Sequence, residues 1–564
     1  MKKFFLILAA LLLLTTMIFA GGGQSSSGGA SGSVGAPGAI PSYINLDGYF
    51  PIVKKGTNVS MTVSWLPDQS FAKHSDPSQI WYFAFVREAF NIDLKVTPRA
   101  QGAETKNLMF AAGDLPDIWM DGLSTNDIVN YGISEKLIIP ITQYINPTLM
   151  PRLSKVLNDD PSLKPPLVAP DSNIYGFPNF RSKTLLHGPI TGGLSRPFFN
   201  KKWLDQLKLK VPETLDQYLA VLRAFKTLGP DVLPDAGIFP QNNFCLVYSA
   251  LGFHWTAGHL ITSVGTRNGN ATFVYGDREI FPKFLETYIT MYKEGLITPD
   301  FFTMEQNARN ALLMAGKGGC ISMPPNTSVA AALQFDYVSA KPLTSALNNK
   351  IFWVGPNNYV NPNLIVLTSK CKTPEAACRL YDYNYDMEDY ILIMQGYPDN
   401  NPKWNLGMDP GWSIGINDNQ VTYKWTPELF EQGVYVLNKI RPVNNTVGML
   451  GNLGIIAKKI YGLNPPKEDW NPANPDSFAR QSTYENLSVH SVIEFPFTVY
   501  WDVKTTQRLT DLSSVINDYV RIQFAQFVTG QRPLSEINNY FTELDKLNYQ
   551  EYLKYYVDYY NKVK

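Results

Sequence analysis

The sequence predicts an α/β protein with more than one hydrophobic core, built from mostly parallel sheets that helices cover. Two observations carry this prediction. Strand-like and helical patterns alternate between residues 59 and 120, and such alternation is typical of a parallel sheet. The chain also has 564 residues, whereas one hydrophobic core stops growing near about 250–300 residues. Two or three domains are therefore expected.

The alternation starts with a strand over 59–65, VSMTVSW, in which β-branched and polar residues alternate. Residues 78–90 carry apolar side chains at helical spacing after a serine cap, which predicts a helix. The same reasoning predicts a strand over 94–97, a helix over 104–112 and a strand over 117–120.

Helical periodicity continues in the rest of the chain. In the helix predicted over 213–228, Pro212 and Glu213 stand in the first turn, where both residue types are tolerated. A buried strand is predicted over 360–369, and 398–505, rich in Asn, Pro, Gly and Trp, predicts irregular structure with short strands. The other predicted helices cover 199–207, 280–294, 304–315, 373–395, 509–529 and 534–563.

The N-terminus has the pattern of an exported protein. Lys2 and Lys3 precede the apolar run 4–14, and small residues follow, which predicts a signal peptide over 1–20. Residues 21–47 begin with a Gly/Ser-rich run that cannot bury enough surface to fold, and they predict a flexible tether. Surface lipoproteins carry a cysteine directly after the cleavage site, but here Gly21 stands there. The sequence therefore predicts a periplasmic or cell-surface location and leaves lipid anchoring open.

Composition and motifs exclude several classes of function. The 49 basic residues balance 49 acidic ones, so the positive field that nucleic-acid binding requires is missing. No HExxH, GxSxG, P-loop or GxGxxG motif is present. Carboxylate pairs such as Glu388 and Asp389 are expected by chance among so many acids. We expect no catalytic residue, no cofactor and no metal; Cys371 and Cys378 either form a disulfide or remain thiols.

Seven segments in order resemble the extracellular solute-binding proteins of carbohydrate ABC transporters, particularly the large lipoprotein-type group that binds oligosaccharides. The resemblance runs from about residue 50 to the end and is weak over 400–500. Its longest segment is RPFFNKKWLDQLKLKVPETLDQYLAVLRAFK, 196–226. The other six are FAAGDLPDIW (110–119), YGISEKLIIPITQYI (131–145), DSNIYGFP (171–178), 285–301 with 316–323, TPEAACRLYDYNYDMEDYILIMQG (373–396), and 518–530 with 534–559.

The resemblance implies a two-lobe fold like that of type II periplasmic binding proteins, with the ligand in a cleft between lobes. It implies a first lobe over 48–180 and 352–398, and a second over 181–351 and 399–564 with the C-terminal helices. It also implies a membrane permease as partner, and we expect a monomer. Many relatives carry a calcium loop where this chain has 227–240; Asp231 and Asp235 remain, but the alternating oxygen ligands are missing, so no calcium is expected.

The candidate ligand residues are side chains at strand ends and in loops that would face the cleft, because sugars stack on aromatic rings and accept hydrogen bonds from planar polar groups. Trp65 and Trp119 have burial in the core as their alternative role, and Arg196 either forms a structural ion pair or holds an acidic sugar. Trp255 is the favoured stacking residue of the second lobe, and Trp255→Ala is expected to weaken sugar binding at least tenfold, at a stability cost below about 1 kcal/mol. The candidates are Trp65, Asp68, Gln69, Trp119, Asp121, Arg181, Arg196, Trp255, Asn326, Trp353, Trp404, Trp412 and Trp501.

The predicted function is capture of a carbohydrate, an oligosaccharide above all, by hinge closure and its delivery to an ABC importer. Two alternatives stay open: the same fold binding a peptide or another polar solute, and a secreted polysaccharide-degrading enzyme. Arg181 and Arg196 are too few to predict a charged ligand.

Overall fold

The computed structural model describes most of the chain from Ile40 to Val563. Contacts divide the chain into Met1–Ala39 and Ile40–Lys564, and the description concerns the second unit. The predicted signal peptide lies outside the described residues. Residues 40–47 of the predicted tether are described, and Ile44 is buried there and bridges to Val53. The described ranges are 40–66, 76–99, 103–120, 122–181, 196–239, 244–255, 264–354, 360–386, 475–492 and 498–563, with residues 389, 393, 495 and short strands between 412 and 450.

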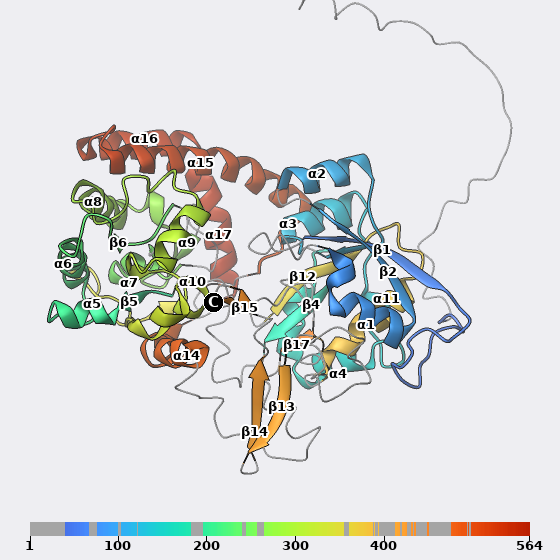
Figure 1. Ribbon diagram of the computed structural model, residues 1–564. Helices are drawn as coiled ribbons and strands as arrows, with labels where there is room; N and C mark the ends of the chain where they lie inside the picture. Colours follow the sequence, from blue (N-terminus) through green and yellow to red (C-terminus); the bar gives the residue numbers. More distant parts are fainter. Residues whose placement is uncertain are drawn as a thin grey trace, which may run out of the picture. The chain divides into compact units, whose positions relative to one another are not determined.

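A six-stranded sheet forms around the first core, in the order β17-β4-β12-β3-β1-β2 (Figure 1). Five of its strands run parallel, and only β12 runs against them. Helices α1 (Trp81–Phe90), α4 (Pro151–Asp159) and α11 (Pro374–Asp382) bury apolar faces in this core. The strands are β1 (Val59–Trp65), β2 (Ile92–Pro98), β3 (Ile118–Met120), β4 (Gly176–Arg181), β12 (Val360–Leu367) and β17 (Gly448–Leu450).

A four-stranded sheet forms the second core, in the order β10-β5-β9-β6. Strands β6 (Leu233–Asp235), β9 (Gly318–Ile321) and β10 (Tyr337–Ser339) share one direction, and β5 (Phe198–Asn200) runs the other way. Helices α6 (Leu215–Lys226), α7 (Phe244–Ala250) and α8 (Ile280–Lys293) pack on this core. Aromatic rings in α7, α8 and the C-terminal helices pack edge to face there, so much of the chain's aromatic content builds this core.

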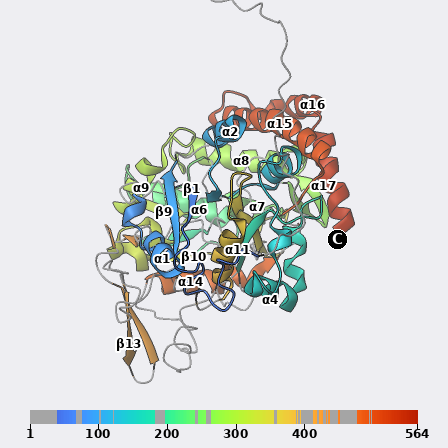
Figure 2. The same ribbon diagram turned by 90° about the vertical axis from the view of Figure 1, so that its right-hand side faces the viewer.

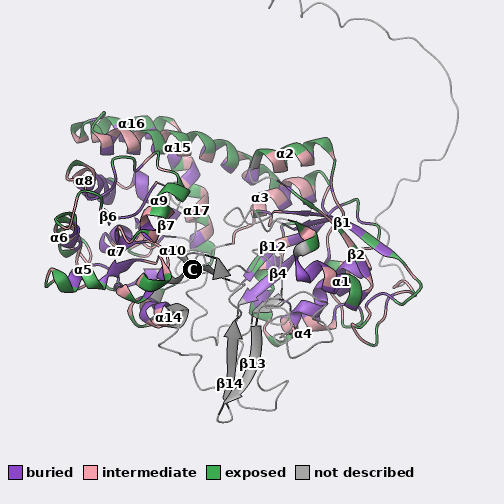
Figure 3. Ribbon diagram, in the orientation of Figure 1, coloured by how far each residue is buried: buried purple, intermediate pink, exposed green. Residues whose placement is uncertain are grey.

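The long helix α15 (Val503–Thr529) has clear signals at both ends. Asp502 caps its first turn by accepting from the N–H of Thr505, at 2.9 Å. Gly530 ends it at φ 80°, a conformation that glycine adopts without strain. Its buried stripe packs on α8, and its outer face is exposed (Figure 3). The helices α16 (Ile537–Lys546) and α17 (Tyr549–Val563) follow it, drawn in red in Figure 2.

The remaining described elements are short. Hairpins form from β7 (Val264–Arg267) with β8 (Asn270–Phe273), β13 (Trp412–Asn417) with β14 (Gln420–Trp425), and β15 (Phe430–Glu431) with β16 (Val434–Tyr435). Strand β11 (Trp353–Val354) pairs with β18 (Ser491–Val492). The short helices are α2 (Ala103–Ala112), α3 (Thr125–Asp127), α5 (Lys201–Gln206), α9 (Gln306–Met314), α10 (Pro325–Ser328) and α14 (Pro475–Asn486).

Most predicted elements of the first 120 residues are confirmed, and four predictions are wrong in detail. The helix predicted over 78–90 begins at Trp81, because Asp76 caps a separate 3-10 turn over Pro77–Gln79. The helix predicted over 213–228 begins at Leu215, where the Thr214 side chain caps it, so Pro212 and Glu213 precede it. The predicted helix 534–563 is two helices, α16 and α17, separated at Asn548, which has φ 60°. Finally, α11 ends at Asp382, inside the predicted helix 373–395.

Two further observations concern membrane and redox chemistry. In the described part of the chain, no helix combines the length and apolarity that a bilayer crossing requires. Cys371 and Cys378 are separate buried thiols in this structure.

Candidate functional site

One edge of the six-stranded sheet gathers three of the predicted positions. Because five strands are parallel, the carboxyl ends of β1, β3 and β4 meet at the same edge. Trp65 ends β1, Trp119 is the middle residue of β3, and Arg181 ends β4. The Arg181 side chain lies outside the described set. So do the predicted residues Asp68, Gln69 and Asp121.

Trp65 and Trp119 are both fully buried. Trp65 packs edge-on against Phe83, with ring centres 5.9 Å apart, and Trp119 packs against Phe110 at 5.1 Å. Within the described part of the chain, neither indole N–H has a hydrogen-bond partner. The burial fits the core role that was their alternative in the sequence, and their contact with a ligand stays a prediction.

Arg99 lies at the same edge and is not among the residues that the sequence predicted. It directly follows β2, and its backbone N–H donates to the carbonyl oxygen of Trp65 at 2.9 Å. Its guanidinium carbon lies 4.5 Å from the centre of the Trp119 ring, which is cation–π geometry. Burial lowers the pKa of Arg99. Its position as the first residue after a strand is a signal that could have found it.

A hydrogen bond joins the C-terminal segment to the first sheet. The side-chain amide of Asn363, in a bulged part of β12, donates to the hydroxyl oxygen of Tyr500 at 2.8 Å. Burial raises the pKa of Tyr500 to about 12, so the hydroxyl stays protonated at neutral pH. Gly176 allows the close approach, since a Cβ there would stand 2.6 Å from the Cα of Asn363. Tyr500 closely precedes α15, so residues far apart in the chain meet here.

The second sheet brings Arg196 to its own carboxyl edge. Strand β9 ends at Ile321, and the antiparallel strand β5 begins beside that end. Arg196 therefore lies next to the end of β9, where its backbone N–H donates to the carbonyl oxygen of Ser322 at 3.1 Å. Asn326 is in α10, which follows β9 closely, and its side chain is not described. The arrangement places both predicted positions near one strand end.

A second arginine, Arg309, lies at this edge and was not predicted. It belongs to α9, the helix that precedes β9 in the chain. Its contact with Met323, two residues beyond β9, places the first turns of α9 near the carboxyl end of that strand. One guanidinium nitrogen, Nη2, lies 3.3 Å from Sδ of Met323 and 3.0 Å from Oδ1 of Asn310. The side chain is 1% exposed. Arg309 shares the buried face of α9 with Leu313, four residues on, and an arginine at such a core position is the sequence signal for it.

In the segment 227–240, where no calcium is expected, the carboxylate of Asp235 accepts hydrogen bonds from the protein itself. Asp235 is buried, accepts from the hydroxyl of Tyr218, and accepts from the N–H of Gly237 at 2.7 Å. In the described ranges, no group of three or more His, Cys, Asp and Glu side chains has an arrangement that could hold a metal ion.

The structure brings two of the predicted tryptophans together. The rings of Trp255 and Trp353 meet edge to face, with centres 5.0 Å apart, and both are almost fully buried in the second core. This burial contradicts the expected low stability cost of Trp255→Ala, since removing a core tryptophan costs about 3–5 kcal/mol. Trp501 packs against Tyr555, Tyr556 and Tyr559 of α17. Trp412 pairs with Trp425 in a hairpin, and Trp404 lies outside the described residues.

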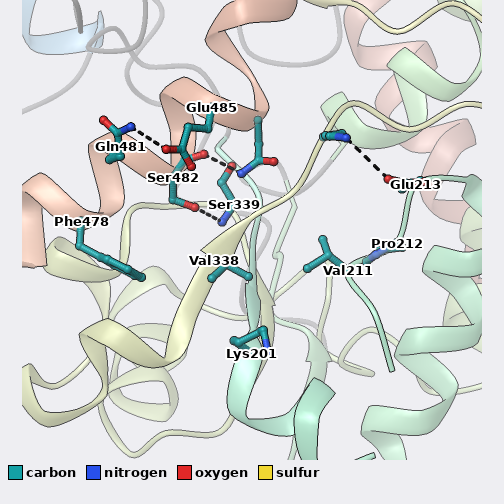
Figure 4. A pocket seen from close by; sticks show the side chains of 12 residues that line it. Lys201, Val211, Pro212, Glu213, Val338, Ser339, Phe478, Gln481, Ser482 and Glu485 are labelled. Atoms are coloured by element: carbon teal, nitrogen blue, oxygen red, sulfur yellow. Dashed lines mark hydrogen bonds and ion pairs between the residues drawn. The ribbon is translucent and has the colours of Figure 1, made fainter. Parts of the chain in front are cut away.

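A groove of about 440 Å³ lies beside the edge strand β10, between α14 and the segment before α6 (Figure 4). Its lining is mixed, with Phe478 and Val338 among polar side chains. The polar groups largely satisfy one another. The Gln481 amide donates to Glu485 at 2.6 Å, and the Ser482 hydroxyl oxygen accepts from the N–H of Ser339 at 2.8 Å. The groove therefore offers a weaker case for a ligand site than the strand ends do.

Comparisons with known proteins agree with this architecture. No protein-family model matches the chain. The fructooligosaccharide ABC transporter substrate-binding protein FusA of Streptococcus pneumoniae is 29% identical over 279 residues, 48% of this chain and 50% of FusA. The polygalacturonan/rhamnogalacturonan-binding protein YtcQ of Bacillus subtilis is 27% identical over 182 residues, 32% of each chain. The matches thus span half of FusA and a third of YtcQ.

The solved structure of S. pneumoniae FusA in complex with kestose has a TM-score of 0.70 to this chain, at 20% identity, and covers 89% of this chain and 99% of that one. This likeness establishes the fold: the chain has the two-lobe α/β fold of periplasmic binding proteins, as the sequence predicted. FusA is a carbohydrate-binding protein of an ABC transporter, which confirms the predicted resemblance.

Proposed function

We propose that this chain is an extracytoplasmic solute-binding protein that captures an oligosaccharide by hinge closure and delivers it to an ABC importer. The observation that carries the proposal is the pair of strand-carboxyl edges. The first belongs to the mainly parallel six-stranded sheet, and the second is the carboxyl end of β9, which pairs in parallel with β6. Trp65, Trp119 and Arg99 lie at the first edge, and Arg196 and Arg309 lie at the second. Ligands of open parallel sheets bind beyond such ends.

A ligand that contacts both edges would stabilise the closed form, since only differential contacts shift a conformational equilibrium. The substrate-binding relatives support this reading, although they match at most half of their own length. We propose a monomeric, exported protein that a membrane permease recognises when closed. Lipid attachment is not part of the proposal, because Gly21 stands where a modified cysteine would be.

The proposed lobe boundaries follow the sequence, with one addition. The first lobe takes 48–180 and 352–398, and the second takes 181–351 and 399–564. Strand β17, inside the second range, pairs with β4 of the first sheet, so 448–450 is assigned to the first lobe. The Asn363–Tyr500 pair supports a crossing of the chain near Tyr500.

The test is a panel of glycans and peptides offered to the purified chain without its first 20 residues. We expect saturable, stoichiometric binding of an oligosaccharide, measured by calorimetry, a rise in melting temperature and a change in tryptophan fluorescence. Chromatography of the recovered glycan should show it intact. Peptide binding alone would establish the alternative ligand class, and a cleaved glycan would establish an enzyme.

A pair of tryptophan variants locates the binding. Trp119→Phe removes a buried indole at the first edge, and we expect at least tenfold weaker glycan binding, or about 1.4 kcal/mol. Trp203→Phe is the matched control, because Trp203 packs on Phe225 of α6 and is not part of either edge. Equal affinities of the two variants would place the glycan elsewhere.

A further inference from the structure

Among the described residues, the buried guanidinium of Arg309 has no carboxylate as ion-pair partner. It is 1% exposed, and its hydrogen bonds go to an amide oxygen of Asn310 and the thioether sulfur of Met323, both neutral. No carboxylate among the described residues forms an ion pair with it. Removing a charge from water without a partner of opposite charge costs several kcal/mol. Burial accordingly lowers the pKa of Arg309.

Two other buried arginines, Arg379 and Arg532, have carboxylate partners. Arg379, 2% exposed, has Asp382 with its carboxylate oxygen 3.7 Å away. Arg532, 8% exposed, pairs with Glu543 at 2.9 Å and with Glu536 at 3.3 Å. At these two positions the fold supplies carboxylates to the buried cation. Among the described residues none takes this role for Arg309, which points to an anion supplied by a ligand.

The position of Arg309 indicates where that anion would come from. Met323, which its guanidinium contacts, stands two residues beyond the end of β9, at the strand-carboxyl edge assigned to the ligand. The backbone N–H of Arg196 donates to the carbonyl oxygen of Ser322 at the same edge, so two arginines are next to this short segment. Because Arg309 is nearly inaccessible in this structure, a ligand reaches it only when the edge opens, as the proposed hinge movement would allow.

We propose that the carbohydrate ligand is acidic, and that a carboxylate of a uronic acid unit pairs with Arg309, with Arg196 as the neighbouring cation. The inference rests on the proposed function and narrows its substrate class. A planar guanidinium binds a carboxylate through two parallel hydrogen bonds. A neutral sugar offers hydroxyl oxygens but no charge, and would leave the buried cation uncompensated.

The test compares an acid with its neutral isostere. Calorimetry measures the unmodified chain with trigalacturonic acid, with the fully methyl-esterified trisaccharide, and with the neutral trisaccharide kestose. We expect the acid to bind at least 30-fold more tightly than its ester. In Arg309→Met the acid should bind at least 30-fold more weakly than to the unmodified chain, with the ester changed by less than threefold. Arg309→Lys should recover part of the loss.

The control is Arg223→Met, which removes an exposed arginine of α6 that pairs with Glu294, and which should leave both affinities unchanged. If the acid and the ester bind equally to the unmodified chain, or if Arg309→Met retains the preference, the inference is wrong. Binding of kestose alone overturns the inference and leaves the proposed function standing. Failure of every glycan overturns both.

Discussion

Two buried arginines, Arg379 in the first core and Arg309 in the second, show opposite solutions to the same problem. The guanidinium of Arg379 stacks on Tyr49, with 4.0 Å to the ring centre, and donates to backbone carbonyl oxygens of Leu149 and Gly48, each at 3.2 Å. Its carboxylate partner Asp382 also accepts from the Tyr49 hydroxyl and from the N–H of Leu153. Arg309 has two neutral hydrogen-bond partners, and no carboxylate in the described part of the chain pairs with it.

The difference separates a buried charge that supports the fold from one for which we propose a ligand as partner. The Arg379 cluster, which we define as Arg379, Asp382, Tyr49 and Arg152, fastens the first described segment of the chain to the first core. The guanidinium of Arg152 also stacks on Tyr49, with its carbon 4.3 Å from the ring centre, and it forms an ion pair with Asp389. Each charge in this cluster has an opposite charge nearby. Arg309 is the opposite case, and four predictions on three variants, Arg379→Met, Tyr49→Phe and Arg309→Met, test the contrast.

The largest effect is expected for Arg379→Met. It leaves the buried Asp382 without its cation, and breaking a buried pair from one side costs about 3–5 kcal/mol. The free energy of unfolding in urea measures the loss. Arg223→Met, at an exposed ion pair, is the control and should cost less than about 1 kcal/mol. Equal small losses in both variants would contradict a supporting role for the cluster.

Tyr49→Phe should cost about 1.5–3 kcal/mol, because it removes a hydroxyl that donates to the buried carboxylate of Asp382. Urea unfolding again provides the measurement. Tyr43→Phe, in the same segment, is a suitable control, since its ring is only partly buried against the first core. A Tyr49→Phe chain as stable as the control would show that Arg379 and backbone N–H groups satisfy Asp382 alone.

The penalty of Arg379→Met should depend on pH. Burial raises the pKa of Asp382, and loss of Arg379 should raise it further. A group whose pKa is higher in the folded than in the unfolded chain contributes stability below its unfolded pKa, and that stability disappears as pH rises through the folded pKa. The penalty should therefore be smaller at pH 4 than at pH 7. A pH-independent penalty would rule out titration of Asp382 as its source.

The smallest effect is expected for Arg309→Met. Because the cation is buried without a carboxylate, its replacement by an apolar side chain of similar length should change stability by less than about 1 kcal/mol. Thermal melting of this variant beside Arg379→Met gives the comparison directly. A loss as large as that of Arg379→Met would make Arg309 a structural residue.

The elements of the first sheet follow from short-range patterns, which is why the sequence predicts them well. The strand over 59–65 has the same bounds in the structure, and alternation of polar and buried residues in β1 explains this. The order of strands and the antiparallel direction of β12 depend on pairings between segments hundreds of residues apart. Local propensity carries no information about them.

The candidate site divides in the same way. The sequence placed Trp65 at the end of a predicted strand, Trp119 inside one, and Arg196 at the start of the longest resembling segment. The structure places each at or beside a strand end. The sequence could not show that Trp65 and Trp119 are buried, because burial depends on the elements that pack over a strand. It also could not separate Trp255 from a core residue, since Trp353, the partner of its ring, lies almost a hundred positions away.

The sequence by itself determined the α/β class, the resemblance to solute-binding proteins and the positions of most strands and helices, because periodicity and end signals are encoded within a few residues. Only the tertiary structure decided which charges are compensated. Arg379 and Asp382 are three residues apart, yet the cluster is completed by Tyr49 from the start of the described chain. Arg309 also lies on the buried face of its helix, and that no described carboxylate pairs with it can be seen only in the tertiary structure. Charge compensation is a property of neighbours in space, and the order of residues along the chain does not fix it.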